Sequence, residues 1–205
     1  NENKKENTFI NCNRAYQWYR KGSLVLYGLR DYIGAAAIDS AIRNFRDEFA
    51  LREEPPYPGS SDLYRHLEAY TPDSLKYYLE DTWKKITLYQ NKAVEASYVQ
   101  KAEDNYEVTL QINTAKMYAD SAGMETPAVY DGDYIDIGIF APEDKDEDGR
   151  TRTNPLYIRK HKLAPGEHTI TIIVNQKPEK AGIDPYNRLI DRIPDDNTVT
   201  VDEST

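Results

Sequence analysis

The sequence lacks most of the signals by which a catalytic or membrane protein is recognised on inspection. It has a single cysteine, Cys12, which excludes an intrachain disulfide, and no histidine lies near it to make it a nucleophile. No run of about 18 apolar residues occurs, so we expect no direct insertion into a membrane. A Gly-rich phosphate loop, a nucleophile-elbow serine and a His-Glu-x-x-His motif are also absent, and each absence removes one common class of active site.

Positive charge is scarce as well. The chain has 26 Lys and Arg against 35 Asp and Glu, for a formal net charge of -9. A nucleic-acid-binding protein needs a basic face to displace counterions from phosphate, so we expect no nucleic-acid partner. Peptides with a free amino terminus carry a positive charge there, so the negative net charge of the chain does not exclude them as substrates.

The first part of the sequence has the 3.6-residue apolar spacing that predicts helices. From Gly22 to Leu29 it is apolar on nearly all sides, so we expect a buried helix that ends at Gly34. Three further apolar stripes follow, namely Ile38, Ala41, Ile42, Phe45 and Phe49, then Leu63, Leu67 and Tyr70, then Leu75, Leu79, Trp83 and Ile86. Prolines and capping residues separate these stripes, which predicts a small helical bundle segment.

After Asn91 the apolar spacing changes from 3.6 to 2 residues, which predicts strands. The alternating apolar residues are Tyr106, Val108, Leu110 and Ile112, then Ile135, Ile137 and Ile139, then Ile170, Ile172 and Val174. One-sided alternation favours an antiparallel β-sandwich. We therefore expect an α+β fold with a flexible segment at 1–14, a helical part at 15–90, and a β-sandwich domain with an irregular tail at 91–205.

Tyr19 is the first candidate for a functional residue. It opens the segment Tyr19-Arg20-Lys21-Gly22, directly before the apolar run Leu24-Val25-Leu26. A phenol at a helix start can donate a hydrogen bond to a developing oxyanion. The alternative is that Tyr19 is one aromatic residue among 17 tyrosines, packed at the start of a helix.

The ordered set of features after Tyr19 resembles the zinc aminopeptidases related to aminopeptidase N and leukotriene A4 hydrolase. The set comprises Tyr19-Arg20-Lys21-Gly22, Leu24–Leu29, Gly34, and the helices around Phe45, Leu67 and Trp83. In that family a tyrosine at this place stabilises the oxyanion at the scissile carbonyl. The resemblance implies zinc-dependent hydrolysis of an N-terminal peptide bond, with residues 15–90 as the end of a catalytic domain and a β-domain after it.

A longer set of features is similar to bacterial proteins that join an aminopeptidase-like domain to an ABC-transporter permease-like region. The set adds Asp133–Gly138 and Gly182-Ile183-Asp184-Pro185-Tyr186-Asn187. This resemblance implies that the zinc ligands lie before Asn1, in an upstream catalytic half that would be a partner of this chain. It also implies a membrane-associated parent, with the side of the membrane left open, while this chain by itself is expected to be soluble and inactive.

Two further readings stay open at this point. Asp144, Asp146 and Asp148, followed by Gly149, match the first half of an EF-hand-like calcium loop, but the twelfth position is Pro155 in place of a bidentate glutamate. The alternative is an acidic hairpin tip. For the whole chain, the alternative to a peptidase fragment is a non-catalytic interaction or scaffold module beside a transporter.

Overall fold

The structure is a computed structural model that describes residues 8–11, 15, 17–145, 147–149 and 151–204. Its helical elements are η1 (Phe9–Asn11), η2 (Gln17–Lys21), α1 (Gly22–Ile33), α2 (Ala35–Phe49), α3 (Ser60–Ala69), η3 (Asp73–Leu75), α4 (Lys76–Leu79), η4 (Glu80–Lys84) and η5 (Pro194–Asp196). Its strands are β1 (Ile86–Tyr89), β2 (Lys92–Ala102), β3 (Asn105–Thr114), β4 (Lys116–Ala119), β5 (Glu125–Pro127), β6 (Asp133–Lys145), β7 (Thr151–Leu163), β8 (Gly166–Val174), β9 (Lys180–Ile183) and β10 (Thr198–Glu203). The expected α+β fold is confirmed, and no described helix is long and apolar enough to cross a membrane.

The chain divides into two compact units. The helical unit comprises Asn1–Thr87 and Tyr118–Thr126, and the sheet unit comprises Leu88–Met117 and Pro127–Thr205. The three strands β1, β4 and β5 form a small sheet, and the division between the units falls within these strands.

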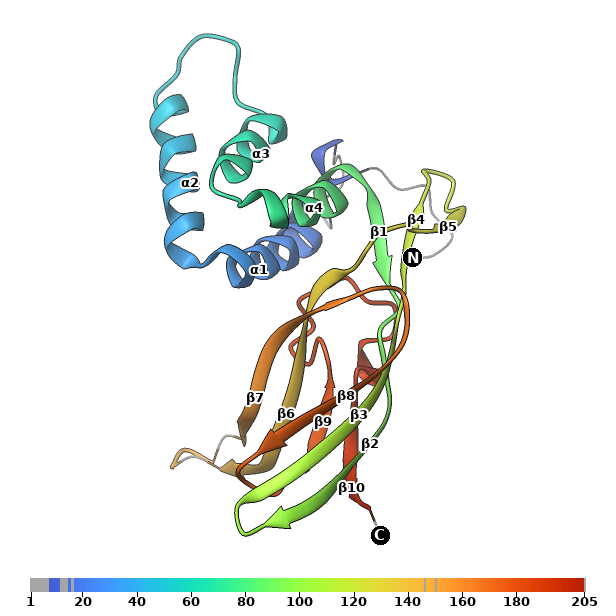
Figure 1. The fold of residues 1–205 in the computed structure, drawn as a ribbon. Helices are drawn as coiled ribbons and strands as arrows, with labels where there is room; N and C mark the ends of the chain where they lie inside the picture. Colours follow the sequence, from blue (N-terminus) through green and yellow to red (C-terminus); the bar gives the residue numbers. More distant parts are fainter. Residues whose placement is uncertain (1–7, 12–14, 16, 146, 150, 205) are drawn as a thin grey trace. The chain divides into compact units, whose positions relative to one another are not determined.

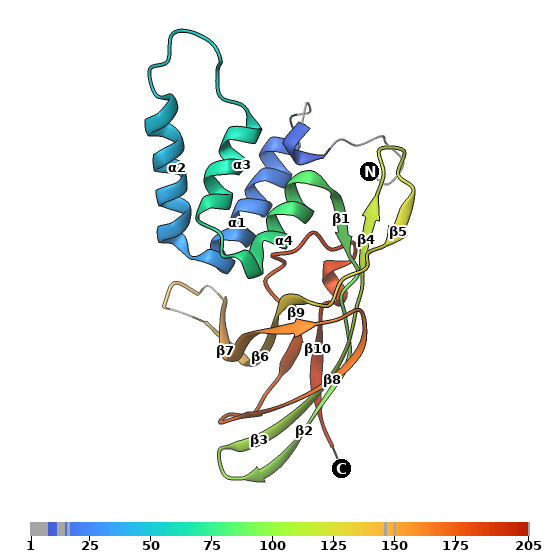
Figure 2. The same ribbon diagram turned by 45° about the horizontal axis from the view of Figure 1, so that its top comes forward.

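In the helical unit, α2 and α3 lie side by side, as both ribbon views show (Figures 1 and 2). Leu29, Leu67 and Leu79 are fully buried in the core of this unit. Helix α1 was expected to be buried on nearly all sides, but only one face is: Val25 and Leu29 are in the core, whereas Tyr27 is exposed. Gly34 ends α1 with a φ of 84°, which favours glycine.

The sheet unit is built on seven strands in the order β7-β6-β9-β10-β2-β3-β8 (Figure 1). Most neighbours run antiparallel, as expected, but β10 pairs with β2 in parallel, with Val201 opposite Ala96. The sheet is therefore mixed. Strand β9 contacts β3 although two strands lie between them, so the sheet curls around its own core.

The core of the sheet unit is made by the predicted alternating residues. The buried members are Val108, Leu110, Ile112, Ile135, Ile137, Ile139, Ile172 and Val174. Pro155 lies on β7 at a register shift against β6. Proline cannot donate to a ladder, and β7 tolerates it because it is an edge strand.

The tail differs from the irregular segment expected from the sequence. Residues 180–183 form β9 and residues 198–203 form β10, and both are interior strands of the sheet. Gly182 is required at its position, because a Cβ there would collide with the Asn197 carbonyl and the Thr198 backbone. The segment between the two strands is irregular, as expected, apart from η5.

Candidate functional site

Tyr19 lies in the π-helical turn η2, directly before α1. Its side chain is 76% exposed, and its hydroxyl forms no hydrogen bond with the residues that the structure describes. Its backbone carbonyl accepts a hydrogen bond from Ser23 Oγ at 2.8 Å, which ties the turn to the helix. Within the described part of the chain the phenol is therefore not a packing residue.

The helix behind Tyr19 is firmly anchored. A Cβ at Gly22 would lie 2.9 Å from the Phe9 ring, so glycine allows a close contact there. The Phe9 ring in turn lies 4.7 Å from that of Trp83. One turn later, the Tyr78 hydroxyl donates to the Val25 carbonyl at 3.1 Å. Residues 1–14 were expected to be flexible, but Phe9 within that segment is buried.

The acidic segment forms a β-hairpin between β6 and β7, and strands flank it as expected. Asp146 lies outside the described residues. Asp144 accepts a hydrogen bond from Asn154 Nδ2 at 2.7 Å, across the hairpin. No group of three His, Cys, Asp or Glu side chains that could hold a metal ion occurs among the described residues. Calcium binding by Asp144, Asp146 and Asp148 stays a prediction.

The three histidines have separate roles. His66 Nε2 lies 2.8 Å from Glu48 Oε2, beside the rings of Phe45 and Phe49. His161 Nε2 lies 2.8 Å from the Tyr157 hydroxyl, and burial lowers the pKa of His161. His168 contacts the backbone carbonyl of Ala164. None of these contacts brings two histidines together.

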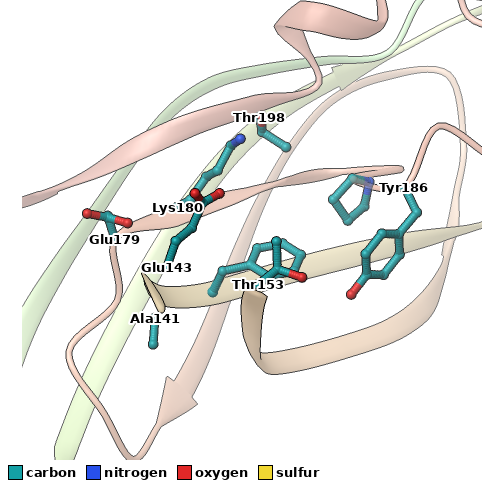
Figure 3. Close-up of a pocket in the computed structure, with 9 residues that line it drawn as sticks. Ala141, Glu143, Thr153, Glu179, Lys180, Tyr186 and Thr198 are labelled. Carbon is teal, nitrogen blue, oxygen red and sulfur yellow. The ribbon is translucent and has the colours of Figure 1, made fainter. Parts of the chain in front are cut away.

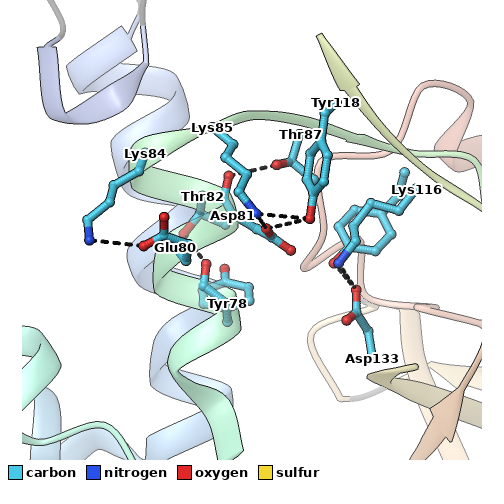
Figure 4. Close-up of polar contacts among 11 residues, drawn as sticks. Tyr78, Glu80, Asp81, Thr82, Lys84, Lys85, Thr87, Lys116, Tyr118 and Asp133 are labelled. Carbon is cyan, nitrogen blue, oxygen red and sulfur yellow. Dashed lines mark hydrogen bonds and ion pairs between the residues drawn. The ribbon is translucent and has the colours of Figure 1, made fainter. Parts of the chain in front are cut away.

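A polar cluster in the helical unit was not expected from the sequence (Figure 4). The buried carboxylate of Asp81 lies 3.0 Å from Lys85 Nζ and accepts a hydrogen bond from the Tyr118 hydroxyl at 2.8 Å. Burial alone would lower the pKa of Lys85, but hydrogen bonds to Tyr118 and Asp81 outweigh it and raise this pKa. Asp81 and Tyr118 are 37 residues apart, so no local pattern could reveal the cluster.

The sheet unit holds a buried ion pair (Figure 4). Lys116 Nζ lies 2.8 Å from Asp133 Oδ2, and the Tyr89 hydroxyl donates to the same oxygen at 2.6 Å. Lys116 Nζ also lies 4.0 Å from the centre of the Tyr130 ring. The lysine and the aspartate are almost completely buried, so each depends on the other for its charge.

Asp184 is a buried titratable group of the sheet unit. Its carboxylate accepts the backbone N–H groups of Arg188 and Leu189, each at 2.9 Å. Arg188 reaches back to Asp136, with Nη1 2.6 Å from Oδ2, and Lys160 binds the same oxygen. Burial raises the pKa of Asp184 to about 7, against the opposing effect of the two backbone hydrogen bonds. The segment after β9 is thus held by a carboxylate that titrates near neutral pH.

A small cavity of about 110 Å³ opens between β6, β7 and β9 in the sheet unit (Figure 3). Its apolar wall includes Phe140, whose ring meets that of Tyr186 edge-on. Glu143, Glu179 and Lys180 also line it. This volume suits a single side chain or a few solvent molecules, and the lining contains no paired nucleophile and base.

No protein-family model matches the sequence, and the comparison with curated proteins found no match.

Proposed function

We propose that the chain is the C-terminal part of a zinc aminopeptidase-like protein, in which Tyr19 donates a hydrogen bond to the oxyanion formed at the scissile peptide carbonyl. The sheet unit would support the helical unit in the parent protein. The basis is the ordered resemblance of Tyr19-Arg20-Lys21-Gly22 and the helices after it to that family. The reaction would be hydrolysis of an N-terminal peptide bond.

The position of the Tyr19 phenol is the observation that carries this proposal. A tyrosine whose role was packing would bury its ring, yet this ring is 76% exposed at the start of an anchored helix. Electrostatic stabilisation of an oxyanion requires a donor that is fixed in place and has no competing partner. The anchoring of Gly22 against Phe9 fixes the backbone from which Tyr19 projects.

Two further exposed aromatic residues of the η2–α1 segment favour a covering surface in the parent. Trp18 is 47% exposed and Tyr27 is 46% exposed. Large apolar side chains that gather at a surface mark interaction sites more often than free surface. We propose that the upstream catalytic half of the parent covers them.

The described residues do not fit a zinc site. Zinc needs at least three protein ligands in a catalytic site, and no group of three His, Cys, Asp or Glu suited to a metal occurs in the described part of the chain. We therefore propose that the ligands lie in another segment of the parent, and we assign to this chain the phenol alone.

The test compares the parent protein with its Tyr19→Phe variant on aminoacyl anilide substrates. Removing one oxyanion donor typically lowers turnover by about 10²–10³-fold, with a smaller change in KM. Because the Tyr19 hydroxyl has no hydrogen bond with described residues, its loss should leave the thermal midpoint unchanged. Tyr57→Phe, at another exposed tyrosine of the helical unit, is the control for turnover alone, because the Tyr57 hydroxyl donates to the Glu53 carbonyl at 3.0 Å; it should keep full turnover.

Unchanged turnover in Tyr19→Phe would remove this residue from the mechanism. A parent without any hydrolytic activity, and with a degraded His-Glu-x-x-His sequence, would instead favour the non-catalytic scaffold. The exposed aromatic residues would then serve assembly.

A further inference from the structure

The cavity between β6, β7 and β9 has no role in the proposed peptidase function. Its lining has an apolar end and a charged end, with Tyr186 at the first and Glu143 and Glu179 at the second (Figure 3). The rest of the apolar lining comes from Phe140, Ala141 and Pro185. The volume of about 110 Å³ suits one side chain with an apolar stem and a charged head.

The apolar walls of this cavity are fixed by close packing around Gly138. A Cβ at Gly138 would lie 2.8 Å from the Phe140 ring and 2.8 Å from Pro185 Cγ, so glycine lets both rings lie against β6. The Phe140 ring also meets the Tyr186 ring edge-on, with the ring centres 6.0 Å apart. These contacts hold the apolar end of the cavity in place.

Two irregularities in the pairing of β6 with β7 flank the cavity. On β7, Leu156 is an extra residue without a counterpart on β6. On β6, Pro142 and Glu143 both lie opposite Thr153. Such bulges change the direction in which side chains point, and they are over-represented next to active sites. The second bulge carries Glu143, whose side chain lines the cavity.

The two carboxylates at the charged end can be reached by a ligand. Glu143 and Glu179 are exposed, and neither carboxylate forms a hydrogen bond or an ion pair with the residues that the structure describes. The backbone of Glu179 is fixed, because its N–H donates to the Phe140 carbonyl and its carbonyl accepts from the Val201 N–H, each at 2.8 Å. Lys180 offsets one of the two negative charges, so the lining keeps a net charge of -1. The charged end therefore favours a cation.

An alkyl chain that ends in an ammonium group fits both ends of the cavity. Lysine side chains bury the alkyl stem on apolar surface and keep the charged head among polar groups. A basic peptide gains more here than a small amine does, because the exposed Asp144 beside Glu143 and the net charge of -9 attract its further positive charges.

We propose that this cavity binds a lysine side chain from a basic peptide segment of a partner. The alkyl stem lies against Phe140 and Tyr186, and the ammonium group meets the carboxylates of Glu143 and Glu179. This inference is independent of Tyr19, which belongs to the helical unit.

The test is a titration of the full chain with acetyl-lysyl-glycyl-lysinamide, followed by amide NMR spectra. The peptide should cause saturable shifts at Ala141, Lys180 and Tyr186. Its affinity should fall as the sodium chloride concentration rises, because salt screens exposed charges. The same peptide acetylated at both side-chain amines should cause no saturable shift. n-Butylamine has the alkyl chain and a single ammonium group, and it should bind about five-fold more weakly than the peptide.

Variants of the two carboxylates test the charged end. Glu143→Gln and Glu179→Gln should each weaken binding about two- to five-fold, the range that one exposed ion pair supports. Because both side chains are exposed, these variants should fold as the wild type does. Glu167→Gln is the matched control: it removes the same charge from an exposed position on β8, which lies at the opposite end of the strand order from β7. It should bind the peptide as the wild type does.

Four results would overturn the proposal. The peptide could cause no saturable shifts at the cavity, or the acetylated peptide or n-butylamine could bind as tightly as the peptide. The affinity could stay unchanged in the double variant that combines Glu143→Gln with Glu179→Gln. Finally, Glu167→Gln could weaken binding as much as the cavity variants do, which would mean that binding follows the net charge of the chain alone.

Discussion

The raised pKa of Asp184 predicts that the sheet unit loses stability as the pH rises towards neutrality. The carboxyl has an ordinary pKa of 3.8 and one of about 7 in the folded protein, because it is 2% exposed. Between these values the folded state binds a proton that the unfolded state releases. Stability is therefore highest below the unfolded pKa and falls through the folded pKa by up to about 1.4 kcal/mol for each pH unit.

The size of the effect follows from the width of this window. Three pH units correspond to about 4 kcal/mol, which is an upper estimate for one carboxyl group. Asp184→Asn removes the titration, so the wild type should lose stability relative to this variant as the pH rises from about 4 to about 7. Above about pH 7 the difference in stability between the wild type and this variant should stay constant. The variant also loses one carboxylate acceptor for the Arg188 or Leu189 N–H, a roughly pH-independent cost of about 1–3 kcal/mol.

The assay must report on the sheet unit. Both tryptophans, Trp18 and Trp83, belong to the helical unit, so their fluorescence would follow the wrong part of the chain. Hydrogen exchange at the amides of Ile137 and Ile183, in β6 and β9, measures opening of the sheet directly. Asp195→Asn, at an exposed position, is the control and should follow the wild type.

The reasoning would be refuted if the difference in unfolding free energy between the wild type and Asp184→Asn did not change between about pH 4 and about pH 7. A wild type that gains stability relative to the variant as the pH rises would mean that the two backbone hydrogen bonds outweigh burial. The pKa of Asp184 would then lie below its ordinary value.

Two further predictions concern the sheet unit. Gly182→Ala should destabilise the sheet unit by more than about 3 kcal/mol, because the new Cβ clashes with the backbone of Asn197 and Thr198 and no side-chain rotation can relieve this clash. Denaturant unfolding measures the loss of stability, and a loss below about 1 kcal/mol would contradict the close approach of the two backbones. Asp133→Asn should cost about 3–5 kcal/mol by leaving the buried Lys116 charge uncompensated, whereas Lys116→Met with Asp133→Leu should cost much less. Equal losses in the single and double variants would show that packing, not the unpaired charge, sets the cost.

The sequence was informative where apolar periodicity is regular. Leu110 and Ile137 lie in strands at alternating positions, and their burial follows directly from that spacing. The α+β order of the chain followed from the change in period near Asn91. The parallel partner of β10 could not be predicted, because pairing direction depends on contacts between residues such as Val201 and Ala96, about a hundred positions apart.

Local patterns were a poor guide to the candidate sites. The apolar sequence of Gly22–Leu29 suggested burial on nearly all sides, yet Tyr27 in this stretch is exposed. The cluster of Asp81, Lys85 and Tyr118 was not marked by any motif, because Tyr118 lies 37 residues from Asp81 and meets it only in the folded chain.

The central place of β10 has a consequence for how the sheet assembles during synthesis. Strands β2, β3 and β8 lie on one side of it and β9, β6 and β7 on the other, yet β10 follows all of them in the chain. Residues Thr198–Thr200 pair with β9, and Val201–Glu203 pair with β2. On a ribosome the two three-stranded halves can form early, but they are joined only when residues 198–203 emerge. The last step in forming the sheet is therefore the insertion of its central strand, β10, between β9 and β2. This step pairs residues far apart in the sequence, and such long-range pairing slows folding.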